Sequence, residues 1–215
     1  MKEKYESQIA FYEVMADLIE LRDKSTGGHV RRTKLYMEVL INGCIEYNIY
    51  RNELSKWDME SILLAAQIHD IGKIGVDSLI LNKPVKLTNT DRKIIEGHVN
   101  DGTDVIFKIN ERIPANDLTV HALHVIRDHH EKWDGSGYPF NLKGNDITLE
   151  GRLMAVIDVY DALTSDRPYK KAFTHEEAAK IIEESSGTHF DSQIIEVFKK
   201  IQYKFAKINK EEKSC

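Results

Sequence analysis

The apolar residues of this 215-residue chain follow helical spacing almost throughout. Residues 4–22 show the pattern, because Ile9, Tyr12, Met15 and Ile19 fall at the three- and four-residue steps that place side chains on one helix face. The alternation that predicts strands is scarce. We therefore predict an all-α fold with strands absent or minor.

Glycine, proline and capping residues divide this pattern into segments. The segment "THEE" at 174–177 is typical of a capping box that opens a helix, and Asp191 is placed to cap the last helix, which we expect to end near Ile208. We expect an ordered loop over 74–87 and a long, polar, glycine-rich loop over 131–149. The other expected helices cover residues 4–22, 29–47, 54–69, 89–110, 117–130 and 150–164.

Composition and charge limit the possible partners. The net charge of −5 and the pI near 6.0 give no electrostatic reason to expect a nucleic-acid polymer or an anionic membrane as partner. The sequence has neither a signal-peptide pattern nor an apolar run long enough to span a membrane. Cys44 and Cys215 are too far apart in sequence to suggest a disulfide framework, which favours a reducing, cytoplasmic setting.

Two apolar helical segments end in adjacent titratable residues, His69-Asp70 and His129-His130. Neighbouring side chains on a helix point about 100° apart, so both cannot face the core unless something binds them. A metal ion would satisfy both, and imidazole with carboxylate suits Fe, Mn, Zn or Co. A single histidine is more often an ordinary structural residue, but further ligand types at His29, His98 and Asp158 favour a metal site. The remaining histidines are interpreted as structural or surface residues: His121, His124, His175 and His189.

Three segments together resemble one known family. They are "HDIGK" at 69–73, "HHEKWDGSGYP" at 129–139 and "DVYDALTSDRPYKKA" at 158–172, with supporting segments at 27–33, 79–88 and 187–195. The chain is similar over about residues 20–200 to the HD-GYP family, metal-dependent phosphodiesterases within the HD superfamily. The resemblance implies an HD-superfamily helical bundle with a dinuclear metal site. It divides the chain into an N-terminal helix at 1–22, a phosphodiesterase domain at 23–205 and a polar tail at 206–215.

The resemblance also implies the metal ligands. One group comprises His29, His69, Asp70 and Asp158, and the other comprises Asp70, His98, His129 and His130, with Asp70 bridging the two ions. Two divalent ions are expected, Fe or Mn first, with Zn, Co or Ni as alternatives. Some family members carry a third metal held by a Glu four residues before the first ligand histidine. That position is Ser25 here, a poor ligand, so we predict two metals.

The expected substrate of this family is cyclic di-GMP, cleaved to linear pGpG and in some members to GMP. Asp70 and Lys73 are the expected catalytic residues, because two metals about 3.5–4 Å apart can generate a bridging hydroxide and a nearby lysine can contact a phosphate oxygen. Lys73, Tyr138, Arg167 and Lys170 resemble substrate contacts. For Arg167, a salt bridge to a neighbouring aspartate is the alternative.

Two other functions stay open. The chain could be an HD phosphohydrolase acting on another nucleotide such as cyclic GMP-AMP, or a catalytically weak signalling module that binds a cyclic dinucleotide. The presence of every ligand in both groups favours an active enzyme. As partners beyond the cyclic dinucleotide, we expect an upstream sensor or receiver domain and a homodimer. The N-terminal helix at 1–22 is interpreted as a connector from that domain or as a dimerisation helix, and packing on the core is the alternative.

Overall fold

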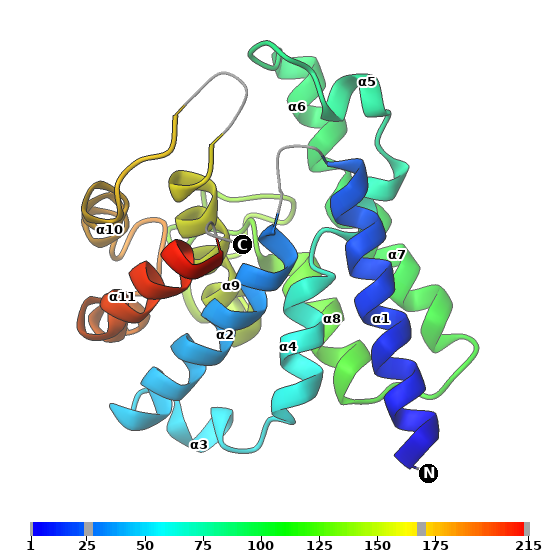
Figure 1. The fold of residues 1–215 in the computed structure, drawn as a ribbon, viewed down its shortest axis with the longest axis horizontal. Helices are drawn as coiled ribbons and strands as arrows, with labels where there is room; N and C mark the ends of the chain where they lie inside the picture. The colour runs from blue at the N-terminus through cyan, green and yellow to red at the C-terminus, as the bar shows by residue number, and fades with distance from the viewer. Residues whose placement is uncertain (1, 24–27, 167–170, 213–215) are drawn as a thin grey trace.

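The computed structural model describes residues 2–23, 28–166 and 171–212. The regular secondary structure of these ranges is almost entirely helical (Figure 1). Within these ranges the β-structure is limited to an isolated bridge between Ser186 and Phe190. The predicted all-α fold is therefore confirmed. Among the described helices, none is both long and apolar enough to cross a bilayer.

Eleven α-helices and two 3-10 helices occur in the described ranges, and their bounds follow in chain order. They are α1 Lys2–Arg22, α2 His29–Glu46, α3 Arg51–Leu54, α4 Met59–Gln67, η1 Ile71–Gly75, α5 Ser78–Leu81, α6 Asn89–Glu96, α7 His98–Asn110, α8 Asp117–Asp128, η2 Gly144–Asp146, α9 Leu149–Thr164, α10 His175–Glu184 and α11 Ser192–Glu212.

Several boundaries differ from the prediction. The segment 54–69 contains the last residue of α3 and the whole of α4. The two helices are separate because Asp58 caps α4 by accepting a hydrogen bond from the Ser61 backbone N–H at 3.0 Å. The segment 89–110 divides at Gly97, a residue of low helix propensity. The expected loop at 74–87 contains the short helix α5, and α11 extends four residues beyond Ile208 to Glu212.

Helix α2 forms the centre of the bundle, where α4, α9 and α11 pack against it. Its Tyr36 ring stacks on Phe205 of α11 with centroids 4.7 Å apart, and Tyr160 of α9 meets both rings edge-on. All three side chains are fully buried. Burying an aromatic side chain of this size stabilises a fold by about 1.5–3 kcal/mol, so this cluster fixes α9 and α11 on α2.

Helix α8 packs against α4, α7 and α9 on the other side of the bundle, and α7 also contacts η1. The contact between η1 and α7 depends on Gly72, because a Cβ at this position would lie 1.9 Å from the carbonyl oxygen of His98. Only glycine allows this approach of the two backbones. As a result, the residues just after α4 lie beside the first turn of α7.

Candidate metal centre

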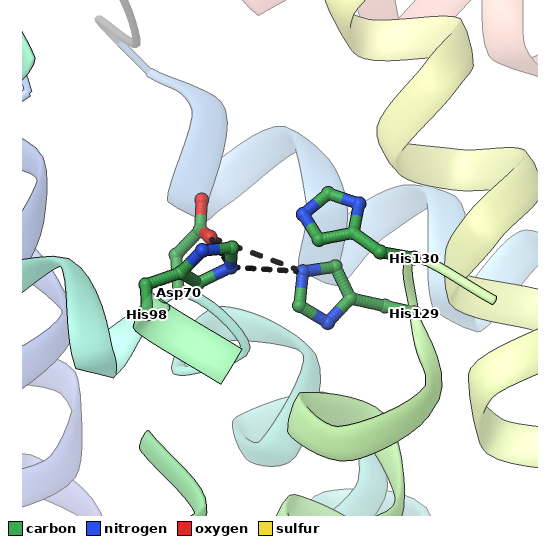
Figure 2. Close-up of side chains that lie close together, drawn as sticks. All are labelled: Asp70, His98, His129 and His130. Carbon is green, nitrogen blue, oxygen red and sulfur yellow. Dashed lines mark hydrogen bonds and ion pairs between the residues drawn. The ribbon is translucent and has the colours of Figure 1, made fainter. Parts of the chain in front are cut away.

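The structure brings the seven predicted ligands together in two adjacent groups. Their ligand atoms lie within 4.8 Å of one another inside each group, and Figure 2 shows one group converging from the end of α4, the start of α7 and the end of α8. The first group is Asp70, His98, His129 and His130, and the second is His29, His69 and Asp158.

Asp70 connects the two groups. Its Oδ1 lies 3.2 Å from Nε2 of His98 and 3.9 Å from Nε2 of His129, both in the first group. Its Oδ2 lies 3.3 Å from Nε2 of His69 in the second group. The two oxygens of one carboxylate thus face different groups, which is the arrangement expected of a ligand shared by two ions.

Four of the histidines are held by the same kind of bond. The Nδ1 atom of His69 lies 2.8 Å from the Ala66 carbonyl, that of His98 2.6 Å from the Ile95 carbonyl, and that of His129 3.0 Å from the Val125 carbonyl. Since a carbonyl oxygen can only accept, each neutral ring carries its proton on Nδ1. The Nε2 lone pair is therefore free to face the cluster. His29 follows the same pattern with the carboxylate of Asp161.

These tautomers place lone pairs against each other. Nε2 of His98 lies 3.5 Å from Nε2 of His129, and Nε2 of His29 lies 3.2 Å from Nε2 of His69. Two deprotonated nitrogens at this distance repel, whereas a cation between them would be bound by both. Nitrogen and carboxylate donors are what Fe, Mn, Zn and Co accept, so the residues fit a divalent metal centre.

The surroundings favour the neutral form of His129 and His130 and the charged form of Asp70. Burial, together with the nearby His69 and His98, lowers the pKa of His129 to about 3. Burial likewise lowers the pKa of His130 well below its ordinary value. Although burial opposes ionisation of Asp70, the adjacent Lys73 and His69 hold the pKa of its carboxyl well below the usual range. These are the protonation states that metal ligation requires.

Asp161 and Arg32 orient His29 of the second group through hydrogen bonds. The Asp161 carboxylate accepts hydrogen bonds from His29 Nδ1 at 2.8 Å and from Arg32 Nε at 2.6 Å. Against the effect of burial, these two partners lower the pKa of Asp161 to about 2. These two bonds fix the orientation of the His29 ring.

A cavity of about 220 Å³ opens beside both groups. Lys73 lines it, with its Nζ 2.7 Å from Oδ2 of Asp70 and 3.1 Å from Oδ2 of Asp23. Against the effect of burial, these carboxylates raise the pKa of Lys73. A charged lysine thus lies where an anionic substrate would approach the metal ligands. The lining of the cavity also includes an apolar part, formed by Leu81, Leu87 and Ile95.

The glycine-rich loop brings Tyr138 to the same cavity, where its ring stacks on His130 with centroids 4.7 Å apart. Glu131 stabilises the same loop. Its buried carboxylate accepts the backbone N–H groups of Phe140 at 2.7 Å and Leu142 at 3.0 Å, so it closes the loop on itself. A Cβ at Gly137 would lie 2.3 Å from the Lys132 nitrogen, which explains the glycine there.

Three residues named from the sequence lie outside the described residues, and four histidines lie outside the two ligand groups. The first kind comprises Ser25, Arg167 and Lys170. The second comprises four histidines that belong to neither ligand group: His121, His124, His175 and His189. His121 and His124 both bond Glu150, at 2.8 and 3.0 Å, in keeping with a structural role.

Sequence reasoning missed Asp23, Arg32 and the apolar cavity wall. Arg32 could have been found, because it lies one helical turn after His29 and therefore on the same face. Asp23 could not, since its contact with Lys73 joins positions 50 residues apart.

A helical bundle with two histidine–aspartate groups that share one carboxylate defines a class of metal-dependent hydrolases. The comparison with known families agrees, because the HD domain model matches residues 13–194. The chain belongs to the HD domain family, and the resemblance to its HD-GYP members is confirmed by the relatives that follow.

A cyclic di-GMP phosphodiesterase of Vibrio cholerae is 39% identical over 194 residues, which are 90% of this chain and 39% of that protein. A 3'3'-cGAMP-specific phosphodiesterase of the same species is 37% identical over 183 residues, which are 85% of this chain and 33% of that protein. The chain thus spans well under half the length of these relatives. Among solved structures, an HD-GYP-type protein from Bdellovibrio bacteriovorus shares the fold, with a TM-score of 0.57 at 14% identity over 89% of this chain and 62% of that one.

Proposed function

We propose that this chain is a metal-dependent phosphodiesterase that opens cyclic di-GMP to linear pGpG. One observation carries the proposal: two groups of inward-facing Nε2 atoms share Asp70 at the edge of a cavity that is also lined by a partly buried, charged lysine. The relatives named for cyclic dinucleotide hydrolysis support the choice of substrate class.

Each group of residues has a definite part in this reaction. Divalent ions in the two groups would lower the pKa of a water and offset the charge of the phosphate. Asp70 divides its two oxygens between the groups and thereby sets their separation. Lys73 offers its ammonium to a nonbridging phosphate oxygen as a point charge. Tyr138 closes the cavity over His130 and excludes water on that side.

The cavity also limits how the substrate binds. Ligand pockets that enclose a drug-sized molecule measure roughly 300–1,000 Å³, so a space of about 220 Å³ takes one phosphodiester with an adjoining sugar or base. Leu81, Leu87 and Ile95 offer an apolar surface to that base. Arg167 and Lys170 are proposed to hold the rest of the nucleotide.

Cyclic GMP-AMP is the second candidate substrate, because a relative at 37% identity is named for it. An apolar wall accepts adenine and guanine alike, so it does not choose between them. A module that binds without hydrolysing is the third reading, and the complete ligand set weighs against it.

The test is purification without oxygen, metal analysis and product chromatography with each dinucleotide. We expect two equivalents of iron or manganese and release of pGpG from cyclic di-GMP, with GMP as the further product if the second step proceeds. Faster turnover of cyclic GMP-AMP would reassign the substrate. Tight binding without hydrolysis, with either metal, would show that the chain is a binding module.

We also propose a bacterial signalling protein in the cytoplasm, with an upstream sensor or receiver domain and a homodimer formed through α1. The inner face of α1 packs on the core through Ala16 and Ile19, whereas Leu18 and Leu21 are exposed. Replacing both leucines with lysine would leave the core intact. We expect this variant to be monomeric by light scattering, and a dimer that survives the change would refute the proposal.

A further inference from the structure

The end of α1 reaches the cavity at Asp23. This carboxylate is only 5% exposed, and its Oδ2 lies 3.1 Å from the Lys73 ammonium. The same ammonium lies 2.7 Å from Oδ2 of Asp70. Lys73 is therefore held between one predicted metal ligand and one carboxylate that belongs to neither ligand group.

Hydrogen bonds from side chains to backbone carbonyls fix the position of Asp23. The Arg22 guanidinium donates to the Ile74 carbonyl at 2.6 Å and to the Val76 carbonyl at 3.1 Å. In return, the Asn82 amide donates to the Arg22 carbonyl at 2.9 Å. These bonds join the last turn of α1 to the segment that begins just after Lys73. The distance between Asp23 and Lys73 is thus set from both sides.

Lys73 needs such a partner. A lysine side chain has four rotatable bonds, and fixing it in one geometry costs rotamer entropy that a partner has to offset. Its ammonium has three donors, of which Asp70 and Asp23 take two, so the third can serve a phosphate oxygen. Asp70 belongs to the predicted metal ligands, whereas Asp23 lies outside both ligand groups.

We propose that Asp23 is a positioning residue for the reaction, which holds the Lys73 ammonium toward the substrate phosphate and acts on catalysis only through Lys73. This inference rests on the proposed phosphodiesterase function. It differs from two other roles that a buried carboxylate in this place can have. One is a direct metal ligand, and the other is a structural tie between α1 and η1.

A double-mutant cycle separates these roles. The variants are Asp23→Asn, Lys73→Met and the two combined, each loaded with manganese and checked for metal content and circular dichroism. Glu13→Gln is the control, because it removes another carboxylate–lysine pair of α1, with Lys34 at 3.0 Å, away from the cavity. The measurements are kcat and KM for cyclic di-GMP and the affinity for inorganic phosphate by calorimetry.

We expect Asp23→Asn to lower kcat roughly ten- to hundredfold with a smaller change in KM, as a misplaced catalytic group does. Phosphate affinity should fall as well, and metal content should stay at the wild-type level. In the Lys73→Met background, Asp23→Asn should change neither kcat nor phosphate affinity further. Asp23→Glu, which keeps the charge, should recover part of the loss, and Glu13→Gln should behave as wild type.

Three results would overturn the inference. A further loss in the Lys73→Met background means that Asp23 acts independently of Lys73. A loss of bound manganese in Asp23→Asn means that Asp23 is a ligand. An equal effect of Glu13→Gln means that α1 merely needs to be tied down. If the wild-type protein hydrolyses no cyclic dinucleotide, the proposed function fails, while the phosphate affinities still decide whether Asp23 acts through Lys73.

Discussion

Replacing Asp161 with asparagine should weaken metal binding through His29, although Asp161 belongs to neither ligand group. The Asp161 carboxylate accepts from His29 Nδ1 at 2.8 Å and from Arg32 Nε at 2.6 Å, and it is 2% exposed. An asparagine keeps the shape but loses the charge. It removes the carboxylate charge that pairs with the buried Arg32 guanidinium and allows the His29 ring to change its tautomer.

The magnitude follows from the environment of Asp161. Its pKa falls from 3.8 to about 2, which corresponds to about 2.5 kcal/mol of stability. Because folding depresses this pKa, the contribution is fully present at neutral pH and is lost as the pH falls below about 4 toward 2. For a chain of this size, such a loss lowers the melting temperature by roughly 5–10 °C. Removing a partner of a ligand histidine weakens metal affinity roughly 10- to 100-fold.

The matched control is Asp191→Asn. Asp191 is equally buried, and it also pairs with an arginine, Arg152, at 2.9 Å, but it contacts no residue of the ligand groups. Both variants should lose stability in thermal unfolding followed by circular dichroism. Only Asp161→Asn should lose affinity in a competition titration with a metal-binding dye. Equal metal affinity in the two variants would refute the argument that Asp161 acts on the metal through His29.

Three further predictions concern other parts of the molecule. Gly72→Ala should abolish activity and metal binding, because its Cβ would lie 1.9 Å from the His98 carbonyl. The control Gly144→Ala strains a φ of +58° but its Cβ meets no atom within 4 Å, so it should lose some stability and still bind metal. A metal-loaded Gly72→Ala protein would contradict this. His98→Ala should bind one metal equivalent fewer by mass spectrometry, while His121→Ala should bind as wild type does, and unchanged stoichiometry in His98→Ala would place the metal elsewhere. Against the effect of burial, hydrogen bonds from two histidines lower the pKa of Glu150 from 4.5 to about 2. The free energy of unfolding should therefore fall by up to about 3 kcal/mol as the pH drops from about 4.5 to 2. Glu150→Gln should reduce this pH dependence in urea unfolding, and an unchanged dependence would disprove the prediction.

The helices and the ligand types could be predicted because both signals are local. Apolar spacing and the capping residues of 174–177 suffice for α10, and the capping box is present in the structure. Breaks inside apolar segments were missed. The helix expected at 54–69 stops at Leu54 and restarts at Met59, and periodicity continues across this break. The break is marked only by the Asp58 cap of α4, a single residue inside an otherwise continuous apolar pattern.

The site shows the same division between local and distant information. The residues of the two groups could be named from the family resemblance, and most of them lie in short motifs that hold their histidines and aspartates within a few positions. The contacts that orient them could not be read this way: the Arg32–Asp161 bond joins positions 129 residues apart, and the Lys73–Asp23 bond joins positions 50 apart. Such pairs come together only after the helices have packed.

This division explains why the least predictable residues are the most informative targets. A substitution at a ligand such as His98 removes donor atoms and tests only whether a metal binds. A substitution at Asp161 or Asp23 leaves all seven ligands and Lys73 in the chain and alters the charge or orientation of one neighbour. These positions can therefore separate metal affinity from turnover, because the first acts on a ligand and the second on the group proposed to meet the substrate phosphate.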